Sequence, residues 1–240
     1  MTSVSRETAA GALRPVLERH GQPTELDAQL ALLLVALLDE PDPHTTVSDP
    51  AAAAEVHVAD SLVALGLPAL REAGSIADVG AGAGFPGLVL AIALPNARVD
   101  LVESSKRKVA LIGRLAEAAD LANARAVHAR AEEWAAGDGR ESYDVVTARA
   151  VGPLAVLAEY AAPLLRVGGL LVAWKGHRDH VEEAAGAAAG AELGFDTPEV
   201  LAVEPYPDSR NRHLHLYRKV SPTPERSPRR PGMAAKRPLG

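Results

Sequence analysis

Residues 77–87, which read ADVGAGAGFPG, place four glycines in eleven positions between two apolar runs. So many glycines in one turn indicate backbone angles that other residues avoid, or a ligand that lies very close to the main chain. Glu103 follows the next apolar run, about twenty residues on, where nucleotide-binding α/β units place an acid that accepts hydrogen bonds from both ribose hydroxyls. The spacing therefore predicts a site for a nucleoside, held over bare backbone N–H groups.

The kind of nucleoside is indicated by three features of the surrounding sequence. Asp78 would repel a phosphate but attract a cationic ammonium or sulfonium group. The glycine turn follows a long helical segment instead of opening the chain, and the last predicted strands do not form a second mononucleotide-binding half. These features favour S-adenosylmethionine over NAD, and an NAD-linked oxidoreductase is the alternative.

The glycine turn lies at the start of an alternation of strands and helices. We predict strands at 76–79, 99–102, 124–128, 143–147 and 170–174, and helices at 87–93, 106–119, 154–165 and 179–193. This alternation predicts a parallel sheet that is covered by helices on both faces. Two further strands, at 200–203 and 214–219, have no helix between them and predict an antiparallel pair at the sheet edge. Three helices, at 6–20, 24–39 and 51–65, precede this unit.

Composition limits the classes of protein that fit the chain. Of the 240 residues, 48% are hydrophobic and 23% are charged, which is usual for a globular protein. There is no cysteine, which excludes disulfides, thiolate metal sites and methylation of a pyrimidine C5 through a cysteine adduct. The most apolar run, at 30–38, is too short to span a membrane, and the first residues lack a secretory leader. We therefore expect a cytoplasmic protein.

Charge is distributed unevenly along the chain. Residues 206–240 hold nine Lys and Arg against two Asp and Glu, a net of +7, so the rest carries −13 of the total of −6. A basic end on an acidic body suggests an anionic partner, and a solvated tail is the alternative. We divide the chain into a helical extension packed on the core (1–70), an α/β domain (71–220) and a flexible basic tail (221–240), which is too rich in Pro, Arg and Lys to bury a core alone.

Residues 77–95 resemble the glycine motif of the bacterial 16S rRNA guanine-N7 methyltransferases, the glucose-inhibited division protein B family. Five other stretches agree with that family: VHVADSL (56–62), VESSKRKVALI (102–112), ARAEEW (129–134), DVVTARAVGPL (144–154) and SPRRPGMAAKRPLG (227–240). The resemblance implies the Rossmann-like fold of class I methyltransferases that depend on S-adenosylmethionine. In that fold, helices precede a mostly parallel seven-stranded sheet with an antiparallel C-terminal edge strand. It implies methyl transfer from S-adenosylmethionine to N7 of a guanine in 16S rRNA. The small ribosomal subunit is then the partner, and we expect a monomer with no metal and no membrane contact.

The resemblance also implies roles for individual residues. Gly80 and Phe85 would pack against the methionine and nucleoside parts of the donor, and Glu103 would hold the ribose. Ala131 and Glu132 would frame the adenine, and Arg149 would face the donor and the target guanine. The expected cofactor-binding residues are Asp78, Gly80, Gly82, Gly84, Phe85, Glu103, Ala131, Glu132 and Arg149. Glu132 could instead be a carboxylate at the start of a helix, where the helix dipole stabilises it, and Arg149 could instead form an ion pair on the surface.

The implied chemistry needs few reactive side chains. Guanine N7 carries a lone pair and no proton, so we expect no general base, and Arg149 is the candidate for a residue that positions the reacting groups. Methylation of an exocyclic amine commonly uses an Asn/Asp-Pro-Pro-aromatic turn after the fourth strand, where residues 147–153 read TARAVGP. Residues 147–153 do not match that turn, which is consistent with methylation of a ring nitrogen that only needs to be positioned.

Three cationic side chains lie in the first turn of the helix predicted at 106–119, where positive charge is unfavourable with respect to the helix dipole. A phosphate backbone at the ligand edge of the sheet would explain them, and a solvated charge run is the alternative. The expected RNA-binding residues are Lys106, Arg107, Lys108, Arg130, Lys175, Arg210 and Arg212. A third hypothesis is a non-catalytic RNA-binding protein, but such a protein would have no reason to keep the costly glycines and Glu103.

Overall fold

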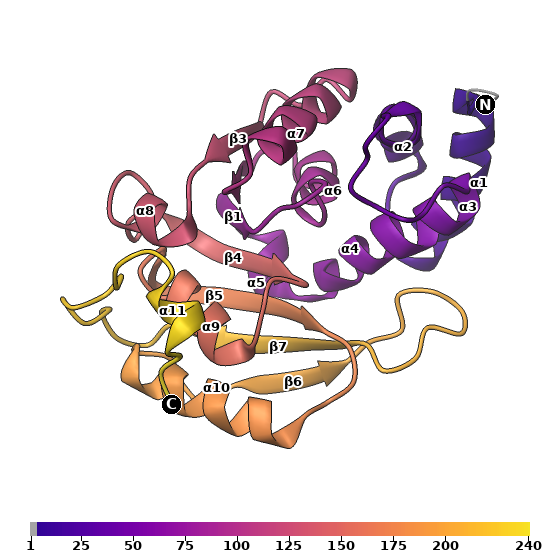
Figure 1. Ribbon diagram of the computed structural model, residues 1–240. Helices are drawn as coiled ribbons and strands as arrows, with labels where there is room; N and C mark the ends of the chain where they lie inside the picture. The colour runs from indigo at the N-terminus through magenta and orange to yellow at the C-terminus, as the bar shows by residue number, and fades with distance from the viewer. Residues whose placement is uncertain (1–3) are drawn as a thin grey trace.

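The computed structural model describes residues 4–240 and contains one mixed sheet with strand order β3-β2-β1-β4-β5-β7-β6 (Figure 1). The strands are β1 (Ser75–Val79), β2 (Arg98–Glu103), β3 (Ala124–His128), β4 (Tyr143–Arg149), β5 (Leu165–Lys175), β6 (Glu199–Ala202) and β7 (His213–Arg218). The first five strands are parallel, and β7 is antiparallel to both β5 and β6. This confirms the predicted fold class, with the antiparallel pair β7–β6 at the edge.

Helices cover both faces of the sheet, as expected for a parallel sheet whose strands are buried on both sides. The N-terminal helices are α1 (Arg6–Arg19), α2 (Asp27–Asp39), α3 (Pro50–Ala53), α4 (Asp60–Leu62) and α5 (Pro68–Arg71). The later helices are α6 (Gly87–Ala93), α7 (Lys106–Ala118), α8 (Ala131–Ala135), α9 (Leu154–Ala161), α10 (His180–Glu192) and α11 (Met233–Lys236). Figure 1 shows α1, α2, α6 and α7 on one side of the sheet and α9, α10 and α11 on the other.

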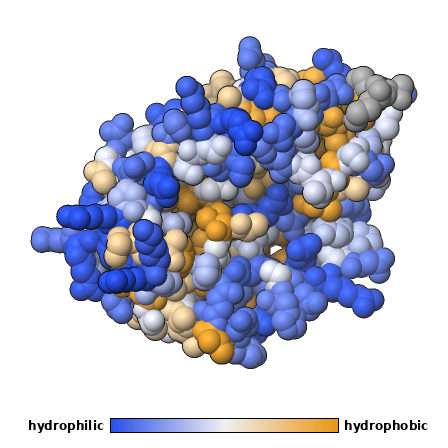
Figure 2. Space-filling model, viewed as in Figure 1, coloured by the Kyte–Doolittle hydropathy of each residue, from blue (hydrophilic) through white to orange (hydrophobic). Residues whose placement is uncertain are grey.

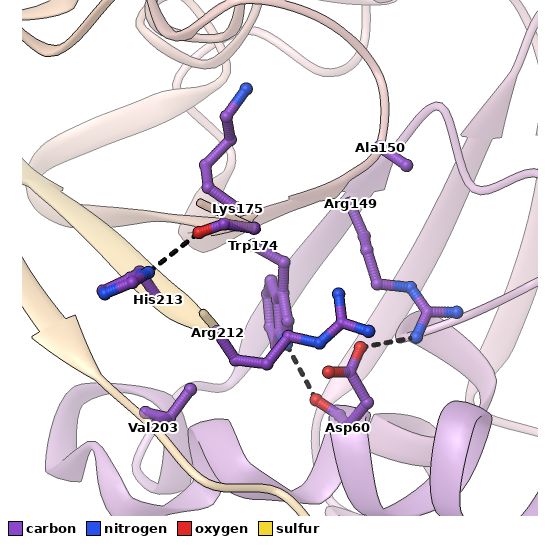
Figure 3. A pocket seen from close by; sticks show the side chains of 9 residues that line it. Asp60, Arg149, Ala150, Trp174, Lys175, Val203, Arg212 and His213 are labelled. Carbon is purple, nitrogen blue, oxygen red and sulfur yellow. Dashed lines mark hydrogen bonds and ion pairs between the residues drawn. The ribbon is translucent and has the colours of Figure 1, made fainter. Parts of the chain in front are cut away.

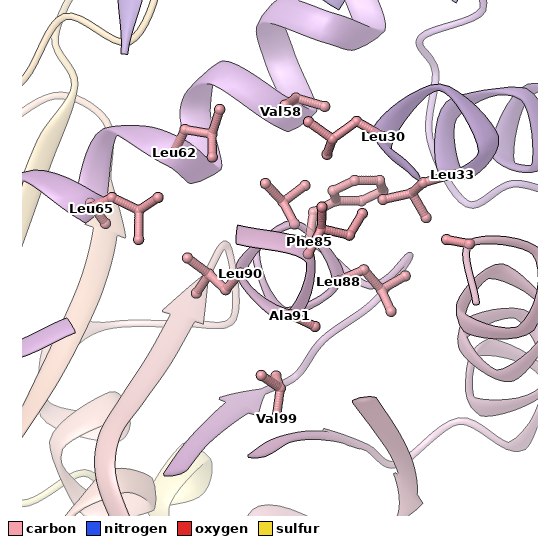
Figure 4. Close-up of a cluster of buried hydrophobic side chains, with 14 of the residues drawn as sticks. Leu30, Leu33, Val58, Leu62, Leu65, Phe85, Leu88, Leu90, Ala91 and Val99 are labelled. Atoms are coloured by element: carbon pink, nitrogen blue, oxygen red, sulfur yellow. The ribbon is translucent and has the colours of Figure 1, made fainter. Parts of the chain in front are cut away.

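The N-terminal helices share a hydrophobic core with one face of the sheet. Leu30, Leu33 and Leu37 recur at helical spacing along α2 and are fully buried. Figure 4 shows Leu30 and Leu33 beside Phe85 and Leu88, which belong to the glycine loop and α6. The segment predicted as one helix at 51–65 is α3 and α4 joined by a π-helical stretch, Ala54–Ala59, and followed by a 3₁₀ turn.

The segment 221–240 differs from the flexible tail that its composition suggests. Thr223, Ser227 and Ala234 are buried, and Leu239 packs against the hydrophobic cluster on the α9 face of the sheet. In Figure 2 the surface around this segment is predominantly hydrophilic, in keeping with the exposed Arg226 and other cations. The composition of the segment reflects the polar residues on its outer surface. It does not reveal the residues that the segment packs against, because these are distant in sequence. We call residues 221–240 the strap.

Within residues 4–240, no helix combines the length and the apolar character needed to cross a bilayer.

The topology fixes where a ligand can bind. The chain leaves β1 toward β2 and leaves β4 toward β5, so a crevice opens between the carboxyl ends of the adjacent strands β1 and β4. Ligands of open α/β sheets bind at such a switch point. The glycine turn follows β1, and Arg149 ends β4, so the predicted site residues meet at this edge.

Candidate functional site

The glycine loop, residues 80–87, joins β1 to α6 in a conformation that requires glycine. Gly80, Gly82 and Gly84 have φ angles of +66°, +60° and +97°. A Cβ atom on Gly80 would also lie 2.6 Å from a methyl group of Val151. Positive φ and close packing therefore both exclude larger residues here.

The backbone N–H groups of this loop are less free than the sequence interpretation supposed. The N–H groups of Gly80 and Ala81 donate to the carbonyl oxygen of Val102 at 2.8 and 3.3 Å, and that of Gly82 donates to Glu103 Oε2 at 3.1 Å. Buried amides must find acceptors, and the neighbouring strand β2 supplies them. The glycines thus allow close approach to the main chain, while these three amides already hold the loop on β2.

Asp78 supports the loop from below and does not face a ligand. Its side chain is 1% exposed, Oδ1 accepts a hydrogen bond from Thr147 Oγ1 at 2.8 Å, and Oδ2 accepts one from the Gly87 N–H at 2.9 Å. Side chains alternate along a strand, which places Asp78 on the same face as Ile76, under the start of α6. Burial raises the pKa of Asp78 to about 6. The expectation of direct contact with a cationic ligand is therefore replaced by a role in fixing the loop, with Thr147 as a partner that sequence reasoning missed.

Glu103 lies at the tip of β2, where the sequence predicted the ribose-binding acid. The side chain is buried, and besides Gly82 it accepts hydrogen bonds from the Ser105 N–H at 2.8 Å and from Ser104 Oγ at 3.4 Å. The carboxylate is thus held rigidly between the glycine loop and the turn into α7.

A cavity of about 140 Å³ lies at the ends of β1, β2 and β3, where Val102 and Ser104, on either side of Glu103 in the chain, line it; we call it the β2 cavity. Its lining residues are Val79, Gly80, Val102, Ser104, Ala129, Arg130, Ala131, Glu132, Val151 and Tyr160. Glu132 is 4% exposed, and one of its oxygens, Oε1, accepts a hydrogen bond from the Gly232 N–H of the strap at 2.8 Å. Of the predicted cofactor residues, Gly80, Ala131 and Glu132 therefore meet at one cavity.

A second cavity, of about 200 Å³, lies on the other side of the same edge; we call it the β4 cavity. It is lined by Asp60, Arg149, Ala150, Trp174, Lys175, Gly176, Val203, Arg212 and His213, most of which appear in Figure 3. Ala150 lines the β4 cavity and Val151 lines the β2 cavity, so the short segment 149–151 lies between them.

Arg149 is anchored in the β4 cavity by the N-terminal region. Its Nη1 donates to Asp60 Oδ2 at 2.8 Å and to the Val56 carbonyl oxygen at 3.1 Å. Trp174 Nε1 donates to the backbone oxygen of Asp60 at 2.8 Å (Figure 3). The ion pair is largely buried and not on the open surface. Sequence reasoning missed Trp174 and the pairing of Asp60 with Arg149, because these residues are distant along the chain.

His57 and Phe85 join the helical region to the glycine loop. Their rings stack with centroids 4.7 Å apart, and His57 Nε2 lies 3.1 Å from Thr45 Oγ1. Burial and, to a smaller extent, the charge of Arg149 lower the pKa of His57 to about 4. A neutral His57 therefore braces Phe85 against the helical region.

The seven predicted RNA-binding cations lie at or near the edge of the sheet that carries the two cavities. Lys106, Arg107 and Lys108 follow β2, and Arg130 follows β3. The remaining three are Lys175 at the end of β5, and Arg210 and Arg212 in the loop before β7. Lys175 differs from the others because its Nζ pairs with Glu182 Oε1 at 2.6 Å and donates to the Gly152 carbonyl oxygen. In the described part of the chain, no group of three or more His, Asp or Glu side chains could hold a metal ion.

This sheet order, with a glycine loop at the switch point and an acid at the tip of β2, defines a class I methyltransferase that depends on S-adenosylmethionine. A predicted O-methyltransferase from Agrobacterium tumefaciens has the same fold, with a TM-score of 0.55 and 26% identity over 68% of this chain and 80% of that one. Fibrillarin from Aeropyrum pernix, whose structure has S-adenosyl-L-methionine natively bound, matches with a TM-score of 0.53 and 18% identity over 66% of this chain and 72% of that one.

Sequence comparison defines the family. The family model described as rRNA small subunit methyltransferase G matches residues 35–210. A relative from Rubrobacter xylanophilus, the ribosomal RNA small subunit methyltransferase G, is 44% identical over 76% of this chain and 72% of its own length. The chain belongs to the rRNA small subunit methyltransferase G family, which confirms the resemblance seen in the sequence.

Proposed function

We propose that this protein transfers a methyl group from S-adenosylmethionine to N7 of a specific guanine in the 16S rRNA of the small ribosomal subunit, in the cytoplasm. One observation carries the proposal: two cavities lie on either side of segment 149–151 at the switch point of the sheet. The name of the relatives supports rRNA as the substrate. The β2 cavity then takes the donor, and the β4 cavity takes the guanine.

The residues of the β2 cavity fit an adenosine group. Val102 and Ser104, the two chain neighbours of Glu103, line the cavity, and the Glu103 carboxylate between them is fixed by the loop and is suited to the ribose hydroxyls. Glu132 keeps one oxygen, Oε2, for an exocyclic amine, since Oε1 is taken by Gly232. Gly80 and Val151 both line the cavity, and a Cβ on Gly80 would collide with Val151 and so disturb this wall. S-adenosylmethionine bound here supplies a methyl group that is already activated by a sulfonium.

The β4 cavity fits the purine. Asp60 Oδ2 accepts a hydrogen bond from Arg149. The other oxygen, Oδ1, can then accept hydrogen bonds from guanine N1–H and the 2-amino group. Trp174 offers an aromatic wall, and base stacking on such a ring contributes about 1–3 kcal/mol. Recognition of the N1 edge leaves N7, on the opposite side of the purine, unobstructed.

The protein's part in the reaction is alignment. N7 has a lone pair ready to attack, so the chain needs to hold the base in line with the methyl group and to remove no proton. Effective molarity from such alignment is worth about 7–11 kcal/mol. Arg149 and Asp60 position the base, and Glu103 and the glycine loop position the donor.

The decisive experiment incubates the purified protein with unmodified small-subunit rRNA and labelled S-adenosylmethionine and maps 7-methylguanosine by base-specific cleavage. We expect one labelled guanine. A Gly80→Val variant should lose the label, whereas Gly11→Ala, at a position where a Cβ meets nothing within 4 Å, should keep it. Label on another base type, or none, would contradict the proposed function.

A further inference from the structure

The strap is anchored on α9 by an ion pair between a buried carboxylate and a partly exposed arginine. Arg229 Nε and Nη2 donate to the two carboxylate oxygens of Glu159, each at 2.5 Å, and Glu159 is 1% exposed. Arg229 Nη2 also donates to the Arg237 carbonyl oxygen at 2.7 Å, which closes the strap on itself. A buried carboxylate needs such a partner, because burying an unpaired charge is strongly unfavourable. Thr223 Oγ1 adds a second anchor by donating to the Ala162 carbonyl oxygen at 2.8 Å.

Three residues beyond its anchor, the strap reaches the β2 cavity. Gly232 has a φ angle of +81°, and its N–H donates to Glu132 Oε1 at 2.8 Å. Glu132 lines that cavity, as does Tyr160, the neighbour of Glu159 on α9. Figure 1 shows α11, in yellow, against α9. The contact is therefore made to a wall of the cavity by a segment 100 residues away in sequence.

We propose that the strap belongs to the cofactor-binding apparatus: the Arg229–Glu159 anchor holds Gly232 on Glu132 and so fixes the wall that meets the adenine. This inference rests on the proposed use of the β2 cavity for S-adenosylmethionine. Arg229 is then a positioning residue that acts through Glu132. Binding of the donor and docking of the strap stabilise each other, and by linkage each does so by the same factor.

The first test measures affinity for S-adenosylhomocysteine by titration calorimetry. The double variant Glu159→Ala with Arg229→Ala releases the strap without leaving a buried charge unpaired. We expect its dissociation constant to rise about tenfold, within the usual range of coupling between sites. The matched control is Arg226→Ala with Glu192→Ala, which removes an exposed ion pair between the same strap and α10 and should leave the affinity unchanged.

The second test follows hydrogen exchange of residues 230–237 in the wild-type protein. S-adenosylhomocysteine should slow exchange there, and the double variant should exchange rapidly with or without it. A double variant that exchanges rapidly yet binds S-adenosylhomocysteine as tightly as wild type would overturn the inference and leave the proposed function intact. A wild-type protein that does not bind S-adenosylhomocysteine would instead reject the proposed cofactor site. If the double variant does not fold, the wild-type exchange measurement decides the matter alone.

Discussion

At the scale of single residues, we expect Asp60 to determine which base fits the β4 cavity. Its carboxylate is shared between Arg149 and the cavity. In an Asp60→Asn variant the amide oxygen can still accept a hydrogen bond from Arg149, but the amide NH2 group, which is a donor, then faces the N1–H and 2-amino donors of guanine. A hydrogen bond to a charged group is worth about 1.5–3 kcal/mol, so we expect kcat/KM for methylation to fall by roughly 10- to 150-fold.

Inosine at the target position provides the control for that variant, because it lacks the 2-amino group. Wild type should lose activity on the inosine substrate, and Asp60→Asn should lose much less on changing from guanosine to inosine. An inosine penalty of equal size in both proteins would show that Asp60 does not contact this edge of the base.

His57 gives a prediction about pH. Its pKa is lowered from 6.5 to about 4, so the folded protein resists protonation that the unfolded chain accepts. Above pH 6.5 His57 is neutral in both the folded and the unfolded state and does not reduce the free energy of unfolding. As the pH falls toward 4, only the unfolded chain is protonated at His57, and the free energy of unfolding declines. Relative to a His57→Phe variant, which keeps a ring against Phe85, wild type should lose about 2 kcal/mol of unfolding free energy between about pH 7 and 5.

Denaturant unfolding of both proteins at the two pH values measures that difference. The exposed His177 replaced by Phe serves as the control and should follow wild type. Parallel pH profiles for wild type and His57→Phe would mean that His57 is not buried in its neutral form.

At the scale of elements, the first turn of α7 presents Lys106 and Arg107, which are exposed, and Lys108, which is half-buried, beside the β2 cavity. Replacing all three by Gln should weaken RNA binding and flatten the dependence of log K on log salt, by about 0.7–0.9 for each phosphate that is no longer neutralised. Filter binding across a salt series measures the slope. Gln at Arg71, Arg166 and Arg218, which lie near the opposite edge of the sheet, should change it less. Equal slopes in the two triple variants would remove the RNA-binding role of this turn.

The elements also show what the sequence can and cannot predict. Strands such as β1 and β4 were predictable because each is a short apolar run next to a turn, and both faces of each strand are buried. α8 has five residues, too few to show a helical period. The roles of Asp78 and of the loop amides depend on Thr147 and Val102, which only the folded sheet brings near. The strap was missed for the same reason, since Arg229 meets Glu159 across 70 residues.

At the scale of the whole molecule, the N-terminal helices and the sheet are expected to unfold together, because they share one core. Leu30 on α2 is 0% exposed and belongs to the same cluster as Phe85 and Leu88. Leu30→Ala should cost about 2–5 kcal/mol of unfolding free energy in a single transition. Calorimetry and circular dichroism should report the same midpoint, and Val181→Ala, at an 80% exposed position, should have little effect. Two separate transitions would mean that the helices form an independent unit.

The two buried titratable groups around the glycine loop have opposite effects on the acid response of the whole protein. Acidification weakens the fold through the His57 imidazole, whose pKa is lowered, and strengthens it through the Asp78 carboxyl, whose pKa of about 6 lies above its ordinary value of 3.8. In mild acid the folded chain takes up a proton at Asp78 more readily than the unfolded chain does, and the unfolded chain takes up a proton at His57 more readily than the folded chain does. The two pKa shifts therefore oppose each other in mild acid, and we expect that replacing either residue alone makes the stability of the fold depend more strongly on pH.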